Sequence, residues 1–130
     1  MIAKFTKRLA AVLFSVLIAV SVLFVAADIA SAATVTVNMG ASTGAPLAYE
    51  PKTVTISAGD SVKWVMNKLG PHNVIFDKVP AGVDARAISH SALASKAGSS
   101  FTVTFDTPGT YSYYCTPHRG AGMVGTVTVL

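Results

Sequence analysis

Apolar and polar positions alternate along most of the chain after residue 33. In the first such run Val35, Val37 and Met39 fall on one face, while threonines and an asparagine fall on the other. This two-residue period is typical of a strand with one buried face. The same pattern predicts strands at residues 34–39, 53–56, 61–67, 72–77, 100–105, 110–115 and 124–130.

Turn-forming residues interrupt these runs. Asp-Thr-Pro-Gly at residues 106–109 predicts a turn, and residues 40–51 read as a loop rich in small residues. The alternation is lost between residues 79 and 98, where residues 84–94 could hold one or two helical turns. We therefore predict an all-β protein, a Greek-key antiparallel β-sandwich of about seven to eight strands with one short helical segment. Trp64 is expected in its core.

The N-terminal 32 residues differ from the rest of the chain. Basic residues near the start precede a nearly apolar stretch at residues 9–26, and Ala-Ser-Ala follows at residues 30–32. We interpret residues 1–32 as a secretory signal peptide with its cleavage site, and residues 33–130 as one mature domain. An uncleaved membrane anchor is the rival interpretation.

Charge and cysteine content narrow the possible functions. The full chain carries a net charge of +4, and removing the signal peptide leaves about +2 with no basic run, which argues against nucleic-acid binding. Export usually leads to an oxidising compartment, yet the single cysteine, Cys115, has no partner within the chain. Metal ligation is one way to occupy such a thiol.

Residues 111–123, YSYYCTPHRGAGM, contain the candidate chemistry. Cys115, His118 and Met123 offer a thiolate, an imidazole and a thioether, a mixture that suits copper cycling between two oxidation states. A second imidazole is then required, and His72 at the start of a predicted strand is the best candidate. His90 has no partner ligand at a useful spacing and is interpreted as structural.

Strand parity supports this assignment. If Tyr111 and Tyr113 face the core, Cys115 points inward with them and Tyr114 points outward. The loop that follows can return His118 and Met123 to the same place. Protein groups then fill all the expected coordination positions, which favours electron transfer and argues against an enzyme.

The segments PHNVIFD around His72 and YCTPHRGAGMVG at residues 114–125 closely resemble the two copper motifs of the plastocyanins, small blue-copper carriers with the cupredoxin fold. The likeness is greatest to members from cyanobacteria and prochlorophytes and extends over residues 34–130. It implies a monomer that carries electrons from cytochrome f of the cytochrome b6f complex to photosystem I in the thylakoid lumen, and one copper ion. The implied ligands are His72, Cys115, His118 and Met123.

The resemblance also implies a docking surface around the exposed histidine. Arg119 matches an arginine that helps docking in cyanobacterial members, and Asn73 matches an asparagine that braces the copper loops. The family's apolar docking positions are matched by Leu47, Pro71, Pro117, Gly120 and Ala121, and its tyrosine beside the cysteine is matched by Tyr114. Gly70 falls in the same patch, at a position where the family varies.

Two departures from the family pattern affect that surface. Plant members carry acidic clusters in the region of residues 78–95, where this chain has only Asp84 together with Lys78 and Arg86. We therefore expect docking through an apolar contact with Arg119 at its rim. The loop before Leu47 is one residue longer than usual.

Three other functions fit the sequence less well. A pseudoazurin-like donor to a periplasmic reductase has a similar Cys, His and Met loop, but such proteins continue into helices after the methionine. A copper-storage protein is expected to have a mobile Met- or His-rich surface, which this sequence lacks. A metal-free adhesion sandwich leaves the Cys115 to Met123 constellation unexplained.

Overall fold

The computed structural model of the chain describes residues 30–130. The predicted signal peptide lies outside the described residues, apart from its last three positions. No helix within residues 30–130 is long and apolar enough to cross a membrane.

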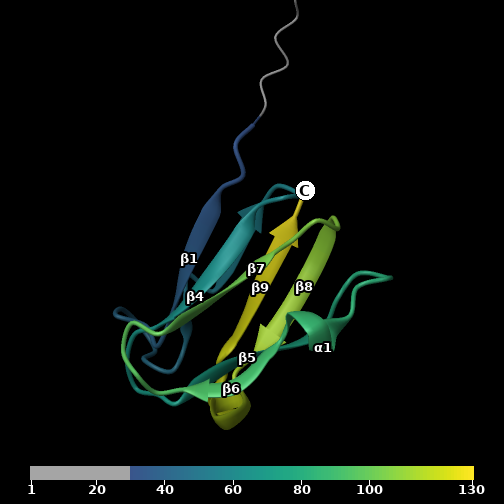
Figure 1. The fold of residues 1–130 in the computed structure, drawn as a ribbon. Coiled ribbons are helices and arrows are strands. Elements are labelled where there is room, and N and C mark those ends of the chain that lie inside the picture. Colours follow the sequence, from purple (N-terminus) through teal and green to yellow (C-terminus); the bar gives the residue numbers. More distant parts are fainter. Residues whose placement is uncertain (1–29) are drawn as a thin grey trace, which may run out of the picture. The chain divides into compact units, whose positions relative to one another are not determined.

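Two sheets build the domain (Figure 1). The first has the order β2-β1-β4-β7, with β2 at Tyr49–Glu50, β1 at Thr34–Met39, β4 at Ser61–Met66 and β7 at Ser100–Thr104. The second has the order β3-β9-β8-β5-β6, with β3 at Thr53–Ile56, β9 at Val124–Val129, β8 at Gly109–Tyr114, β5 at His72–Lys78 and β6 at His90–Ala94. The helical elements are α1 at Ala85–Ile88 and the 3-10 helix η1 at Thr116–Ala121.

The predicted fold class and all seven predicted strands are confirmed, and the differences have physical reasons. The segment 84–94 is helical only in α1, because β6 occupies its second half. This edge strand has no fully buried residue, so the alternation that marks a strand is missing. The predicted loop at residues 40–51 contains the two-residue β2. The sheets are also mixed, since β1 runs parallel to β4 and β3 runs parallel to β9.

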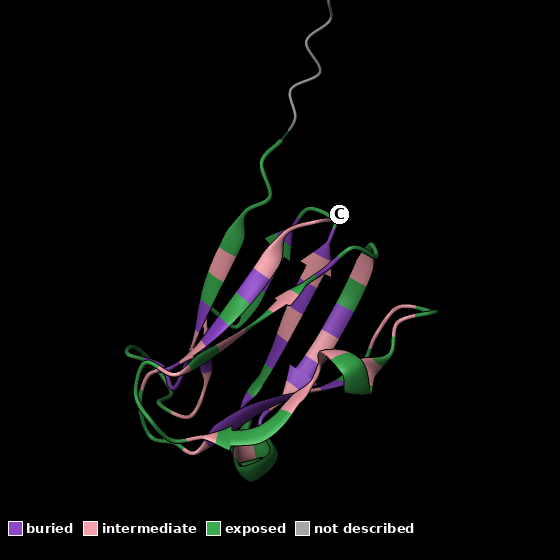
Figure 2. Cartoon of the chain, viewed as in Figure 1, coloured by how far each residue is buried: buried purple, intermediate pink, exposed green. Residues whose placement is uncertain are grey.

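Buried positions alternate with more exposed ones along the strands (Figure 2). The buried positions include large aromatic side chains of the core. The fully buried ring of Trp64 stacks on Phe101 with the ring centroids 5.2 Å apart and meets Tyr113 edge-on at 5.4 Å. Tyr111 and Tyr113 both point inward from β8. Cys115 keeps the same parity one step past the strand, so the core packing directs its thiol inward.

One end of the domain gathers the candidate residues. The amides of Asn67 and Lys68 donate to the carbonyl of Met39 at 3.0 and 3.3 Å, which fixes the turn that leads into β5. In β8, Tyr114 pairs with Ile75 of β5 and with Val124 of β9. The end of β8, the start of β5 and η1 therefore lie together, as the olive turn below β6 shows in Figure 1.

Candidate metal centre

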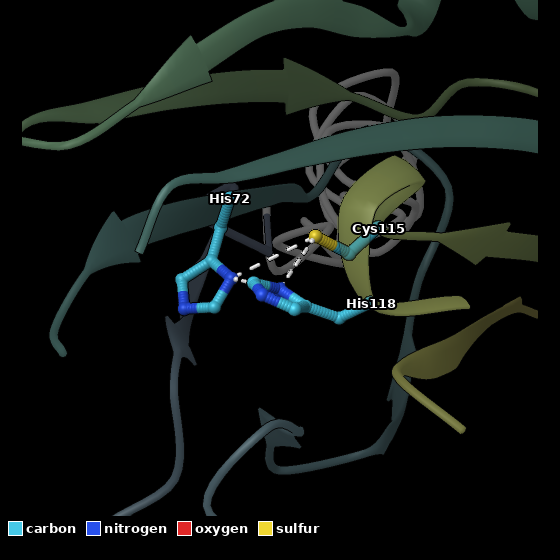
Figure 3. A group of neighbouring side chains, drawn as sticks. All are labelled: His72, Cys115 and His118. Atoms are coloured by element: carbon cyan, nitrogen blue, oxygen red, sulfur yellow. Dashed lines mark hydrogen bonds between the residues drawn. The ribbon is translucent and has the colours of Figure 1, made fainter. Parts of the chain in front are cut away.

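Three side chains converge where β5 begins and β8 ends (Figure 3). Nδ1 of His72 lies 3.1 Å from Nδ1 of His118. The sulfur of Cys115 lies 3.6 Å from the first nitrogen and 3.5 Å from the second. His72 and Cys115, which are 43 positions apart in the sequence, thus lie with His118 around one point.

The spacing of these atoms fits a metal ion. A triangle with these sides has its centre about 2.0 Å from each corner, close to the bond lengths of about 2.0 to 2.3 Å that nitrogen and sulfur ligands make with a divalent metal. Two imidazoles and one thiolate are also the donors of a blue-copper site. His72, Cys115 and His118 could therefore hold copper.

The buried ring of His72 is oriented by a backbone carbonyl. Its Nε2 lies 2.8 Å from the carbonyl oxygen of Lys68, and because that oxygen can only accept, Nε2 carries the hydrogen. Nδ1 of the neutral ring then has a free lone pair aimed at His118 and Cys115. Burial, with a smaller contribution from His118, lowers the pKa of His72 and favours this neutral form, although the Lys68 carbonyl opposes the shift.

A close backbone approach supports that carbonyl. Gly40 has a φ of +91°, and a Cβ atom placed on it would overlap the carbonyl oxygen of Lys68. The side chain of Asn67 donates to the Gly40 carbonyl at 2.7 Å. Glycine is therefore required at this position, both for the backbone conformation and for the space beside Lys68.

Cys115 is fully buried at the end of β8. Its amide donates to the carbonyl of Met123 at 3.0 Å, which returns the chain to the start of β9. Burial raises the pKa of the Cys115 thiol, and the amides of Asn73 and His118 lower it in part. The metal-free protein therefore keeps the thiol protonated, and a metal must displace this proton to bind the sulfur.

The 3-10 helix η1 brings His118 back beside Cys115. The amide of His118 donates to the Cys115 carbonyl at 3.2 Å, and the amide of Met123 donates to the His118 carbonyl at 3.1 Å. Gly122 ends the helix with a φ of +85°, a left-handed conformation that suits glycine. Met123 is fully buried, whereas His118 is half-buried.

Asn73 joins the two elements that carry the donors. Its Oδ1 accepts from the amide of Thr116 at 2.8 Å, and its Nδ2 donates to the Thr116 hydroxyl at 3.0 Å and to the Ser91 carbonyl at 3.2 Å. The hydroxyl of Tyr49 donates to the Asn73 carbonyl at 2.6 Å. β5, β6, η1 and β2 are thereby tied together behind the site.

The structure places the predicted docking residues at different levels of exposure. Leu47, Pro71 and Tyr114 are half-buried, and the exposed members of the set are Gly70, Pro117, Arg119, Gly120 and Ala121. Tyr114 was expected to be exposed. It is only half-exposed because the guanidinium of Arg119 lies over its ring, 3.9 Å from the centroid.

Sequence reasoning missed several residues around the site. The Lys68 carbonyl gave no signal, since it is a backbone atom, and Thr116 gave none because a threonine in a loop is unremarkable. Leu69 lies in the turn before β5, where it is 53% exposed and has a φ of +56°, which is unusual for a residue other than glycine. The sequence gives no signal for this conformation. Asp77, at the end of a predicted strand, pairs with Arg119.

Two packed sheets that hold a buried cysteine between two histidines define a blue-copper protein, an electron carrier of the cupredoxin class. A family model described as copper binding proteins of the plastocyanin/azurin family matches residues 35–130. This chain belongs to that family, and copper is its cofactor.

Plastocyanins are prominent among the similar proteins. The plastocyanin of Prochlorothrix hollandica is 61% identical over 127 residues, which cover 98% of this chain and 96% of the relative. The plastocyanin of Nostoc punctiforme is 47% identical over 95% of this chain and 93% of its own. Among solved structures, a mutant plastocyanin of fern matches with a TM-score of 0.62 and 38% identity over 73% of this chain and 99% of its own. A pseudoazurin from Sinorhizobium matches with a TM-score of 0.61 and 32% identity over 75% and 74%.

Proposed function

We propose that this protein carries single electrons from cytochrome f of the cytochrome b6f complex to photosystem I. The observation that carries the proposal is the convergence of two imidazole nitrogens and one thiol sulfur within 3.6 Å of one another at the end of a packed sandwich. The proposed copper ligands are His72, Cys115, His118 and Met123. Copper bound there supplies a one-electron couple between Cu(II) and Cu(I).

The protein's own hydrogen bonds hold the donors in place. His72 is fixed by the Lys68 carbonyl, Cys115 by the carbonyl of Met123, and η1 by Asn73. None of these bonds involves a metal ion, so the donor atoms need not move when the charge of the site changes. A site that does not rearrange passes an electron at a small reorganisation cost. We infer that the protein transfers electrons and does not transform a substrate.

His118 is the proposed point of electron entry and exit. Its ring lies at the rim of the domain, and its neighbours Pro117, Gly120 and Ala121 are exposed and small. A partner can therefore approach the ring edge closely. Leu47, Gly70, Pro71 and Tyr114 are proposed to complete this surface, and Arg119 is proposed to steer an acidic partner towards it.

The proposed location is the thylakoid lumen, reached by export with residues 1–32 as the signal peptide. The high identity to a plastocyanin of Prochlorothrix over nearly the whole chain supports this location. The mature protein is proposed to act as a monomer in transient complexes.

Flash-induced oxidation by photosystem I and reduction by cytochrome f test the role. We expect fast transfer with both partners, and we expect Arg119→Gln to slow the reaction with photosystem I by roughly two- to tenfold at low ionic strength. Lys63→Gln, which removes the same charge from the exposed face of β4, is the matched control and should change little. An unchanged rate in Arg119→Gln refutes the steering role, and no transfer to photosystem I by the native protein refutes the function.

A further inference from the structure

Arg119 is held by two groups on the second sheet. Nη2 of Arg119 donates to Oδ2 of Asp77 at 3.1 Å. The guanidinium carbon lies 3.9 Å from the ring centroid of Tyr114, within the range of a cation–π contact. The ion pair and the ring together keep the arginine flat on the sheet, whereas an unpaired arginine side chain samples many rotamers.

A β-bulge places Asp77 where it can do this. Phe76 pairs with Tyr113 and Lys78 pairs with Ser112, so two steps along β5 match one step along β8. Asp77 is the extra residue between them. Bulges are common next to functional sites, where they redirect a side chain. The same strand begins with His72, so Asp77 is built into one of the elements that carry the metal donors.

The ion pair between Arg119 and Asp77 contributes little to the stability of the fold. The side chains of Arg119 and Asp77 are 55% and 32% exposed, and ion pairs with this exposure contribute little to folding. Their exposure does keep them within reach of a partner. Arg119 has five N–H donors, and the bond to Asp77 is its one side-chain hydrogen bond among residues 30–130, so other donors remain available to a carboxylate.

We propose that Asp77 is a positioning residue for docking, which holds Arg119 against Tyr114 and thereby sets how the rim of the copper site meets an acidic partner. Asp77 offsets the arginine charge at long range and limits the reach of the side chain. A partner carboxylate must then come to the rim itself to engage the guanidinium. This inference rests on the proposed role of Arg119 in docking. It adds that Asp77, which is not part of the docking surface, determines the position of the arginine.

The first test reads the position of Arg119 directly by NMR on the full reduced protein. In Asp77→Asn we expect the Tyr114 ring signals to shift and the Arg119 Nε–H to exchange faster with solvent. Asp77→Glu should restore most of both. Asp106→Asn is the matched control: it makes the same charge change in the turn before β8, about 20 Å along the strand from the site. Unchanged Tyr114 and Arg119 signals in Asp77→Asn overturn the proposal.

The second test uses small inorganic oxidants, so it does not depend on the photosynthetic partners. The reduced copper protein is mixed with hexacyanoferrate(III), an anion, at low ionic strength. We expect Asp77→Asn to raise the rate by about two- to threefold, because a nearby negative charge is lost and the arginine is released. With the cation tris(phenanthroline)cobalt(III) the rate should fall, and both effects should vanish at high salt.

A double-mutant cycle separates positioning from charge alone. We expect Arg119→Gln to slow the reaction with hexacyanoferrate(III) more in the Asp77→Asn background than in the native protein, since an arginine released from Asp77 reaches farther towards the anion. Additive effects of the two substitutions overturn the proposal, because fixed charges act independently. If the copper-loaded protein is colourless, the proposed copper ligands are refuted and the oxidation experiments cannot be run. The NMR test then still determines the position of Arg119 in the metal-free protein.

Discussion

The two histidines of the site occupy opposite environments. The inner histidine, His72, begins a strand, is fully buried, and has its Nε2 bonded to the Lys68 carbonyl. The outer histidine, His118, lies in the six-residue 3-10 helix η1 and is half-buried. Among residues 30–130 no group accepts a hydrogen bond from its Nε2, although its Nδ1 lies as close to Cys115 as that of the inner histidine.

The difference shows how one site meets two demands. Electron transfer requires donor atoms that stay in place, and the inner histidine meets this demand because the packed sheet and a backbone carbonyl fix its ring. Exchange with a partner requires a short path to the surface, and the outer histidine meets this demand because Pro117, Gly120 and Ala121 of η1 are exposed and leave room beside its ring. Asn73 couples the two sides, since it lies in β5 and bonds the first residue of η1.

Replacing each histidine by glycine tests this contrast with the largest expected effect. Both His118→Gly and His72→Gly should lose the colour of the copper protein. Added imidazole should restore it in His118→Gly, because the vacated place opens to solvent, and should fail in His72→Gly, where the ring has 0% exposure. Absorbance titrations with imidazole measure this. Equal recovery in both variants contradicts the inner and outer assignment.

The coupling between the two sides should contribute measurably to stability. Asn73→Ala removes the hydrogen bonds that the buried Asn73 side chain makes to the amide and hydroxyl of Thr116 and to the Ser91 carbonyl, and we expect it to lower the free energy of unfolding by about 2 to 3 kcal/mol. Urea unfolding of the metal-free protein measures the loss. Asn38→Ala, a half-buried asparagine in β1, is the control and should cost much less. Equal losses of stability in the two variants would contradict the claim that Asn73 couples β5 to η1.

The inner histidine should make stability depend on pH, with a smaller effect. Burial lowers the pKa of His72 below its ordinary value of 6.5 in the folded metal-free protein. The unfolded chain then binds the proton more readily, so the contribution of His72 to stability is complete above pH 6.5 and is lost as the pH falls towards the folded pKa. Urea unfolding between about pH 5.5 and 7.5 should show this slope, and His72→Gln should flatten it. An equal slope in both proteins contradicts the buried neutral ring.

The turn beside the inner histidine carries the smallest predicted effect. Leu69 has a φ of +56°, so Leu69→Gly should raise the free energy of unfolding by about 0.5 to 1 kcal/mol through relief of strain. Leu93→Gly is the control, because Leu93 is equally exposed but lies in β6, where glycine should destabilise. Thermal unfolding compares the two. Destabilisation by both substitutions means that Leu69 is not strained.

Much of the copper site could be predicted because its signals are local. Cys115, His118 and Met123 lie within nine residues, and the parity of β8 already directs Cys115 inward. His72 was found from its place at the start of a predicted strand. The core residue Trp64 was equally clear, since a single tryptophan on an apolar strand face has few other places to lie.

The rest depends on information that a sequence pattern does not contain. The Lys68 carbonyl is a backbone atom, and only the folded turn shows that it orients His72. β6 was missed because an edge strand without a buried face loses its alternation. Asp77 meets Arg119 through a bulge, and a shift of register between β5 and β8 cannot be read from either strand alone.

The visible absorption spectrum of the copper-loaded, oxidised protein tests the central claim most directly. If Cys115 binds copper together with His72 and His118, the protein will show an intense thiolate-to-copper band towards the red. Ascorbate will bleach this band, and Cys115→Ser will abolish it. A protein that takes up copper and stays colourless would contradict the claim, because the buried thiol would then not be a ligand.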